Sequence, residues 1–306
     1  MKIAVIGAGG VGGYFGARLA RGGHDVTFVA RGRHLAAIRE RGLAIESALG
    51  DATVRCPATD DLSALGPVDV AMLCVKLWDV EATAPKLAGI VSNGGVVIPF
   101  QNGVESADRV AAALGASHVL GGVAYIAATI RAPGVIAHTG TMARLRVGAF
   151  PGGPDDRAAA FADACRSAGI EVEHVPDIRR ALWEKFVFLA SFSGITSAAR
   201  VPIGVVRADP DLRAAFESAV REAWAIGRTR GLALADDYVA RQLAFLDGLP
   251  ADMRSSMQND LAAGNRLEAP WLSGAVARMA AESGLPAPVS ATLYAAMKPW
   301  VDGAHP

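Results

Sequence analysis

The stretch MKIAVIGAGGVGGYFGA, residues 1–17, decides the fold of the first half of the chain. A short apolar run typical of a β-strand leads directly into Gly7-x-Gly9-x-x-Gly12. In this motif the first glycine permits a tight turn, the second lets the backbone approach a pyrophosphate, and the third lets a helix pack closely on the sheet. The free N–H groups and the positive dipole end of the following helix attract phosphates. The motif predicts a dinucleotide site, and the alternative is a glycine-rich turn that only packs. The expected contacts come from the whole turn: Gly7, Ala8, Gly9, Gly10, Val11 and Gly12.

The rest of the first half alternates between strand and helix patterns. A helical stretch to Arg21 precedes the strand pattern of residues 24–31, and two further apolar strand patterns occupy residues 68–75 and 94–100. Alternating strands and helices predict a parallel sheet with helices on its faces. Residues 119–150, rich in Val, Ile, Ala and Thr around a Pro-Gly turn, predict antiparallel hairpins.

The second half has a different pattern. From Asp177 onward, long Ala-, Leu- and Arg-rich stretches are interrupted by Gly and Pro, which predicts helices joined by short loops. The length of 306 residues also suggests about two domains. We therefore expect an α/β protein with an N-terminal Rossmann-type dinucleotide-binding domain over residues 1–176. An all-helical C-terminal domain is expected over residues 177–306.

The composition argues against several classes of protein. The chain is 52% hydrophobic, and its 30 basic residues balance 30 acidic ones, so net charge suggests neither a nucleic-acid nor a membrane-surface partner. Three widely spaced cysteines indicate reduced thiols rather than a disulfide framework. No apolar stretch reaches the roughly 18 to 20 residues of a transmembrane helix. Together with the reduced thiols, this predicts a soluble cytoplasmic protein. The six histidines lack metal-ligand spacing, so we expect no metal site.

The end of the second strand indicates which dinucleotide binds. A site for NAD usually carries Asp or Glu there, which binds the ribose 2′-hydroxyl. Here Arg31 stands nineteen residues after Gly12, and Arg33 and His34 follow it. A guanidinium can pair with a 2′-phosphate through two parallel hydrogen bonds. We therefore expect NADPH as the cofactor, and the alternative is that Arg31 is a solvated loop charge.

Two later strand patterns are also followed by polar residues. Lys76 ends the first of them, and Gln101 and Asn102 end the second. In an open parallel sheet, ligands bind beyond the carboxyl ends of the strands. All three residues are therefore expected near the nicotinamide. For Asn102, an Asn-Gly turn without a binding role is an equal alternative.

Lys185 heads the apolar stretch KFVFLASFSG in the second half. At helical spacing, Phe188, Leu189 and Phe192 share its face. An unpaired charge is costly to bury, so Lys is rarely inside without a partner. Either Lys185 extends its ammonium into water, or it donates a proton at the rim of a substrate cleft. Glu268, just before another apolar helical run, is ordinary by itself, because a first-turn carboxylate complements a helix dipole.

Six segments closely resemble, in chain order, those of the ketopantoate reductase family, also called 2-dehydropantoate 2-reductase. They are IGAGGVG (6–12), VKLWD (75–79), QNGV (101–104), LWEKF (182–186), SSMQND (255–260) and NRLEAPWLSG (265–274). The resemblance covers essentially the whole chain. It implies a Rossmann domain followed by an all-helical domain, with the active site in the cleft between them. It also implies the reduction of ketopantoate to pantoate with NADPH, a step toward pantothenate and coenzyme A, and it places Lys76 and the backbone near Ala127 on the cofactor side.

The resemblance further implies roles for four side chains. Lys185 matches the family's lysine, which donates a proton to the substrate carbonyl oxygen as hydride arrives from the nicotinamide. Glu268 matches a glutamate that hydrogen-bonds the substrate and helps to hold that lysine. Asn102 matches an asparagine that contacts both substrate and nicotinamide, and Ser256 matches a serine that binds the carboxylate end of the substrate.

Three positions depart from the family pattern. Where the family carries asparagines four and eight residues after the lysine, this chain has Leu189 and Ser193, and a further asparagine position holds Ile203. We expect Leu189 and Ser193 to remain on the substrate side, with fewer polar partners for a substrate hydroxyl. A pocket built to bind a hydroxyl rejects analogues that lack it by up to about 10⁴-fold. Losing such partners favours the hypothesis of a more apolar 2-oxo acid as substrate.

Three functions therefore stay open. The first is ketopantoate reductase, and the second is a paralogous NADPH-dependent reductase of a different, more apolar 2-oxo acid. The third is a non-catalytic NADPH-binding sensor, which would need neither Lys185 nor Glu268. Both enzyme hypotheses have a small-molecule 2-oxo acid as partner, and the apolar C-terminal helices leave a homodimer open without predicting one.

Overall fold

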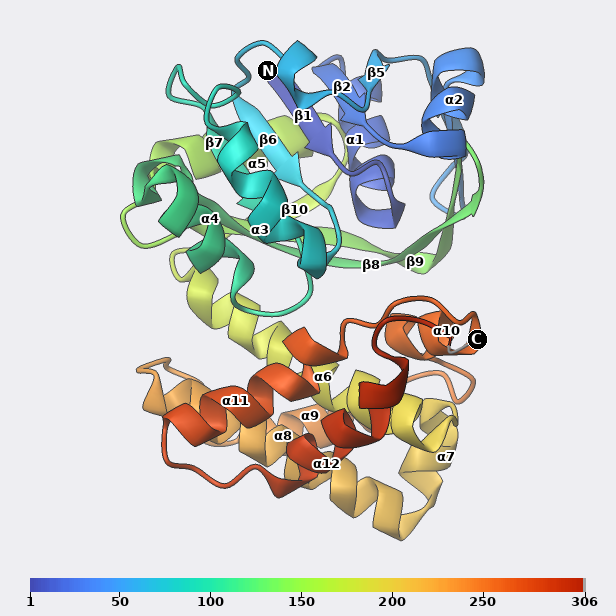
Figure 1. The fold of residues 1–306 in the computed structure, drawn as a ribbon, viewed down its shortest axis with the longest axis vertical. Helices are drawn as coiled ribbons and strands as arrows, with labels where there is room; N and C mark the ends of the chain where they lie inside the picture. Colours follow the sequence, from blue (N-terminus) through green and yellow to red (C-terminus); the bar gives the residue numbers. More distant parts are fainter. Residues whose placement is uncertain (305–306) are drawn as a thin grey trace. The chain divides into compact units, whose positions relative to one another are not determined.

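The computed structural model describes residues 1–304 (Figure 1). Residues 305 and 306, the last two of the expected helical domain, lie outside the described residues. The chain divides into two compact units, one α/β and one helical, as the sequence predicts. The first comprises residues 1–101 with 105–181, and the second comprises residues 102–104 with the chain from 182 onward. The expected boundary between residues 176 and 177 stays a prediction, because α6 (Ile178–Ala199) runs across this division.

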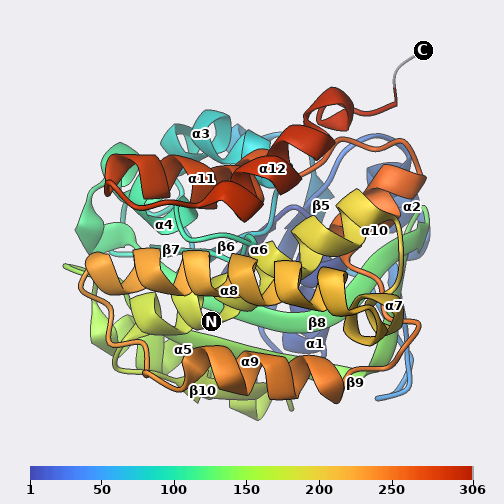
Figure 2. The ribbon, with the colours of Figure 1, turned by 90° about the horizontal axis from the view of Figure 1, so that it is seen from below.

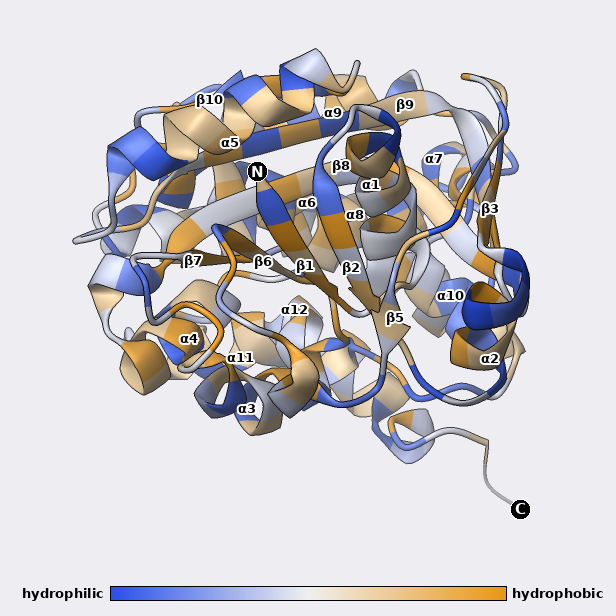
Figure 3. Cartoon of the chain, turned by 90° about the horizontal axis from the view of Figure 1, so that it is seen from above, coloured by the Kyte–Doolittle hydropathy of each residue, from blue (hydrophilic) through white to orange (hydrophobic). Residues whose placement is uncertain are grey.

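The first unit is built on a five-stranded sheet in the order β5-β2-β1-β6-β7. Its strands are β1 (Lys2–Ile6), β2 (Asp25–Val29), β5 (Ala58–Thr59), β6 (Val70–Leu73) and β7 (Val96–Pro99). All four pairings are parallel, so the strands end at one edge. β6 and β7 are buried along their whole length, and Figure 3 shows both as largely hydrophobic. Such continuous apolar strands are typical of a parallel sheet that is covered on both faces.

The strand order fixes where a ligand can bind. From β1 the chain moves outward to β2 and β5, and it then crosses back to β6 on the other side of β1. The order therefore reverses between β1 and β6, and open sheets bind ligands beyond the carboxyl ends of the strands at this point. The turn that follows β1 is the glycine motif. The helices of this unit are α1 (Gly10–Arg21), α2 (Gly32–Arg41), α3 (Val80–Thr83), α4 (Ser106–Leu114) and α5 (Asp155–Ser167).

A second sheet in the same unit contains the expected antiparallel hairpin. Its strands are β3 (Leu43–Ser47), β4 (Ala52–Val54), β8 (Leu120–Ala132), β9 (Val135–Ala149) and β10 (Glu171–His174). β8 and β9 pair along most of their length, and the register shifts between Ile126 and Ala128. Because Ile126 pairs with Ala143 and Ala128 with His138, Ala127 lies opposite a bulge in β9.

The second unit is helical throughout its regular elements. After α6 it contains α7 (Ile203–Ala208), α8 (Pro210–Thr229), α9 (Tyr238–Asp247), α10 (Ser256–Ala262), α11 (Ser273–Glu282) and α12 (Pro288–Met297). α8 contacts α7, α9, α11 and α12, and Figure 2 shows it between α9 and α12. Apolar residues of these helices form one core, which includes the fully buried Phe216 and Val220 of α8. Six short 3₁₀ helices complete the described chain: Leu62–Ala64, Leu77–Asp79, Ala84–Leu87, Ala116–His118, Ala269–Trp271 and Lys298–Trp300.

None of the helices within residues 1–304 combines the length and the apolar character that crossing a bilayer would require.

Candidate active site

The glycine turn has the geometry that its motif predicts. Gly7 has φ +105°, a left-handed conformation that glycine adopts without a steric penalty. A Cβ at Gly7 would lie 2.9 Å from the carbonyl group of Cys74 and from the amide nitrogen of Val75, so the turn after β1 sits directly against the end of β6. At Gly12 a Cβ would lie 2.2 Å from the carbonyl oxygen of Gly7, which only glycine tolerates. These contacts place the turn at the reversal point of the sheet.

Gly9 differs from its neighbours because it borders open space. A Cβ at Gly9 would meet nothing within 4 Å, whereas one at Gly10 would lie 2.0 Å from the carbonyl oxygen of Ala128. Gly9 is also the N-cap residue of α1, and no side chain caps this end of the helix. The first N–H groups of a helix have no partner within it, and they attract anions together with the helix dipole. The open side of the turn therefore fits a pyrophosphate group.

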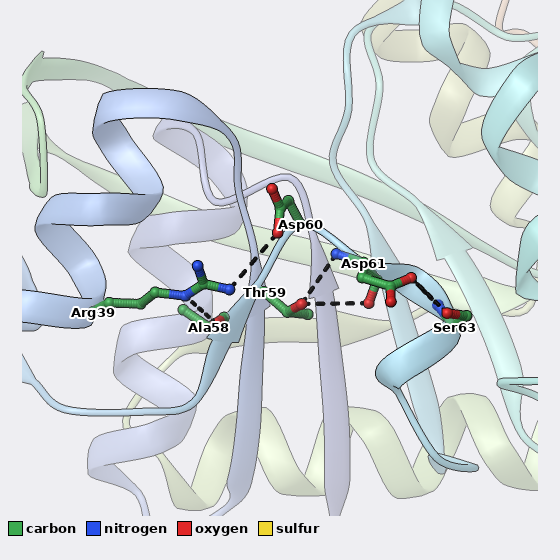
Figure 4. Close-up of polar contacts among 6 residues, drawn as sticks. All are labelled: Arg39, Ala58, Thr59, Asp60, Asp61 and Ser63. Carbon is green, nitrogen blue, oxygen red and sulfur yellow. Dashed lines mark hydrogen bonds and ion pairs between the residues drawn. The ribbon is translucent and has the colours of Figure 1, made fainter.

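Arg31 and Arg39 lie on the same helix and have different surroundings. Arg31 is the exposed N-cap residue of α2, immediately after β2, and residues 1–304 supply no hydrogen bond or ion pair to its guanidinium. Arg39, near the other end of α2, donates from Nε to the carbonyl oxygen of Ala58 at 2.9 Å and lies 3.7 Å from the carboxylate of Asp60 (Figure 4). Arg31 therefore keeps its charge available to an anionic ligand, while Arg39 contacts β5 and the residue that follows it.

The ends of β6 and β7 are tied together by a side chain whose geometry the sequence does not reveal. Gln101 donates from Nε2 to the carbonyl oxygens of Leu73 at 2.8 Å and of Val75 at 3.0 Å. The following residue, Lys76, is exposed, and its ammonium lies 5.6 Å from the ring centre of Trp78. Gln101 thus fixes the path of the backbone that leads from β6 to Lys76.

The backbone near Ala127 lies close to the glycine turn, because Gly10 packs against the adjacent Ala128. Ala127 itself is exposed, on the part of β8 that faces the β9 bulge. The structure therefore gathers most of the expected cofactor-side residues in the first unit, at the carboxyl edge of the parallel sheet or next to it.

In the second unit, Lys185 has two polar neighbours. Its Nζ donates a hydrogen bond to Oδ1 of Asn102 at 2.8 Å, so the side chain of Asn102 contacts the lysine. Burial lowers the pKa of Lys185 to about 8, and the negative charge of Glu268 opposes this shift. Glu268 is only 7% exposed. It is the N-cap residue of the short helix Ala269–Trp271, and its side chain makes no capping hydrogen bond there.

The apolar face beside Lys185 packs into the helical core. Phe188 stacks on Phe192 with ring centroids 5.6 Å apart, and it meets Phe216 and Phe245 edge-on. Lys185 itself is half-buried on the same helix. Phe192 is buried in this core and Phe188 is partly buried against it, so core packing explains both phenylalanines.

The remaining expected substrate residues occupy different environments. Leu189 is half-buried one turn after Lys185, while Ser193, two turns after it, is 1% exposed and its Oγ has no hydrogen-bond partner in the described chain. Ser256 is exposed at the first position of α10, and the preceding Ser255 caps that helix. Ile203 is fully buried in the helical core.

The fold and these two groups of residues define a class of protein. A parallel sheet with a glycine turn at its reversal point, followed by a helical unit that carries a lysine of lowered pKa, is the architecture of a two-domain dinucleotide-dependent oxidoreductase. The family model described as "Ketopantoate reductase PanE/ApbA" matches residues 3–152, and the model of the C-terminal part of the same family matches residues 177–300. The chain belongs to the ketopantoate reductase family, whose members are oxidoreductases acting on a CH–OH/C=O pair.

Individual relatives agree on the family and differ in what they are named for. The chain is 32% identical to a 2-dehydropantoate 2-reductase of Halobacterium salinarum, with 96% of each chain covered. It is 30% identical to an uncharacterized oxidoreductase of Bacillus subtilis, with 96% of this chain and 97% of the relative covered.

Two solved structures show the same fold. A PanE/ApbA family ketopantoate reductase of Ralstonia eutropha is similar with a TM-score of 0.90, 31% identity and 98% of each chain covered. A D-mandelate dehydrogenase, solved with NADH and anilino(oxo)acetate, has a TM-score of 0.88 at 20% identity over 98% of each chain. The second likeness is one of fold alone.

Proposed function

We propose that this protein reduces 2-dehydropantoate to pantoate with NADPH. The observation that carries the proposal is the polar group around Lys185, whose ammonium is bonded to Asn102 and whose pKa is lowered to about 8. A general acid works best when its pKa lies near the working pH. The relative from Halobacterium salinarum is named for this reaction, and its match covers 96% of the chain.

In the proposed reaction, bound NADPH supplies a hydride to the carbonyl carbon of the substrate. Lys185 donates a proton to the carbonyl oxygen and becomes a neutral amine, so that the carbonyl group gains one hydride and one proton. Before the reaction, the ammonium charge stabilises the negative charge that develops on this oxygen. Asn102 accepts a hydrogen bond from one of the three N–H groups of the ammonium and thereby orients the other two. Glu268 keeps the lysine protonated, because its negative charge raises the pKa that burial lowers.

The preference for NADPH rests on Arg31. Its guanidinium follows β2, where a carboxylate would bind the ribose of NAD, and it has no other partner among residues 1–304. We assign the pyrophosphate to the glycine turn from Gly7 to Gly12, with Lys76 and the backbone at Ala127 as further cofactor contacts. Ser256, Ser193 and Leu189 are assigned to the substrate side.

A second candidate is the reduction of a more apolar 2-oxo acid by the same machinery. It is favoured by Leu189 and Ile203, because Leu189 carries no hydrogen-bonding side chain and Ile203 is fully buried in the core. Neither side chain can bind a substrate hydroxyl.

Both candidates are tested by one comparison of substrates. We would measure NADPH oxidation with 2-dehydropantoate and with 3,3-dimethyl-2-oxobutanoate, which lacks only the hydroxyl group, and repeat both with NADH. A kcat/KM that favours 2-dehydropantoate by about 10³-fold or more supports the first candidate, since a site built for a hydroxyl rejects analogues without it. Equal values, or a preference for the analogue, support the second. NADPH binding without turnover of any 2-oxo acid would contradict both and support a sensor.

A further inference from the structure

His34 joins two separate parts of the first unit. Its Nε2 lies 2.8 Å from the carbonyl oxygen of Ala8 in the glycine turn, and its Nδ1 accepts a hydrogen bond of 3.0 Å from the backbone N–H of Gly134. Gly134 forms the turn between β8 and β9, where it has φ +79°. The half-buried imidazole thus bridges the glycine turn and the hairpin turn.

These two contacts define one state of the ring. A carbonyl oxygen only accepts, so Nε2 must carry a proton to bond Ala8. A backbone N–H only donates, so Nδ1 must offer its lone pair to Gly134. The neutral tautomer protonated at Nε2 satisfies both contacts at once, whereas the other neutral tautomer satisfies neither.

The bond to Ala8 orients the peptide that borders the open side of the glycine turn. The peptide between Ala8 and Gly9 is trans, so its C=O and N–H point in opposite directions. When the carbonyl group points toward His34, the N–H of Gly9 points away from it. Gly9 borders open space and is the N-cap residue of α1, where N–H groups attract a pyrophosphate. Loss of this bond would free the peptide to rotate.

The same residue also fixes the start of α2. His34 lies in the first turn of that helix, three residues after Arg31, whose carbonyl oxygen accepts from the N–H of Leu35 at 3.3 Å. The hairpin turn packs on this helix as well, since a Cβ at Gly134 would lie 3.0 Å from the Cβ of Ala37. His34 therefore sets the position of Arg31 relative to the glycine turn.

We infer that His34 is a positioning residue for the cofactor. In its neutral, Nε2-protonated form it holds the pyrophosphate-binding turn at a fixed distance from the arginine that binds the 2′-phosphate. The inference rests on the proposed use of NADPH. His34 itself touches neither phosphate and acts through the Ala8–Gly9 peptide and the first turn of α2.

Two substitutions separate its two hydrogen bonds. In His34→Gln the side-chain amide reaches the position of Nε2 and can still donate to Ala8, but the acceptor for Gly134 is lost. In His34→Asn the side-chain oxygen takes the position of Nδ1 and can still accept from Gly134, but the donor to Ala8 is lost. Since each variant lacks one hydrogen bond, both are expected to lose similar amounts of thermal stability.

The two variants should differ in cofactor affinity. We expect His34→Asn to raise the Kd for NADPH by about tenfold, the effect of one hydrogen bond of about 1.4 kcal/mol, while His34→Gln stays within about threefold of the wild type. Binding is measured by titration calorimetry, so the test does not require turnover. KM for NADPH should follow Kd, and kcat at saturating NADPH should change much less. His24→Asn is the matched control, because His24 Nε2 lies 3.1 Å from the carbonyl oxygen of Ala164, away from the glycine turn.

Three results would overturn the inference. Equal NADPH affinities for the two variants would show that the bond to Ala8 has no positioning role, and so would a loss of kcat at unchanged Kd. The third result concerns the ¹⁵N shifts of the wild-type imidazoles, in which His34 is assigned by comparison with His34→Gln. The inference expects a ring protonated at Nε2 only, and a ring protonated at Nδ1 would overturn it. A wild-type protein that binds no NADPH would instead contradict the proposed function, on which the inference rests.

Discussion

The ammonium of Lys185 donates a 2.8 Å hydrogen bond to the side-chain oxygen of Asn102, a residue 83 positions earlier in the chain. Asn102 directly follows Gln101, whose amide holds the end of β6. A neutral amide orients the lysine without adding a negative charge beside it. The charge that supports the ammonium comes from Glu268 and only partly offsets the effect of burial. This arrangement brings the pKa of Lys185 down to about 8.

The rate of substrate reduction should fall at alkaline pH. With a pKa of about 8, Lys185 is protonated below that pH and able to donate its proton, and it loses this ability above it. We therefore expect kcat/KM for reduction to be level below about pH 8 and to fall tenfold per pH unit above it. Oxidation of the alcohol needs the neutral amine as base, so its kcat/KM should rise up to about pH 8 and be level above it; we call the sloping part of each profile its pH limb.

Lys185→Ala should lower kcat by roughly 10² to 10⁴-fold while NADPH affinity stays near that of the wild type. A variant with near wild-type kcat would show that another group supplies the proton.

Substitutions at the two neighbours of Lys185 should move this pH limb in opposite directions. In Glu268→Gln the negative charge that supports the ammonium is removed, so the pKa of Lys185 should fall further and the limb should shift to lower pH. In Asn102→Asp a negative charge is placed at the oxygen that accepts from Lys185, so its pKa should rise and the limb should shift to higher pH. Both replacements preserve the size of the side chain. Shifts in the same direction, or no shift, would assign the limb to a group other than Lys185.

Adjacent glycines in the turn should respond differently to alanine. Gly9→Ala meets open space at φ −77°, so its stability should remain within about 0.5 kcal/mol of the wild type. Its methyl group would occupy the side where the pyrophosphate is expected, and the Kd for NADPH should rise by about tenfold or more. Gly10→Ala would place a methyl group 2.0 Å from the carbonyl oxygen of Ala128, and such overpacking typically costs about 1 to 3 kcal/mol. Thermal unfolding and NADPH titration of both variants check this contrast, which fails if Gly9→Ala binds NADPH normally.

The sequence predicts those features that depend on local pattern. Strand, glycine turn and helix follow from Gly7, Gly9 and Gly12, because each backbone requirement lies within a few residues of the next. The contacts of Gln101 and His34 escape such analysis, since their partners are backbone carbonyl and N–H groups that any residue would supply. For Phe188 the pattern is visible in the sequence, but it has two explanations, because an apolar helix face can line a cleft or pack into a core. Only the packing of the other helices decides between them.

Arg31 and Arg39 give a matched test of cofactor choice on one helix. Arg31→Ala should raise the Kd for NADPH by at least about tenfold and change that for NADH little, because only NADPH carries the 2′-phosphate. Arg39→Ala removes the same charge from α2 but breaks contacts to Ala58 and Asp60, so its effect should fall mainly on stability (Figure 4). Since Arg39 is exposed, that loss should be about 1 kcal/mol or less. Equal losses of NADPH affinity in the two variants would indicate a general effect of positive charge, whereas a loss confined to Arg31→Ala assigns the 2′-phosphate to the N-terminus of α2.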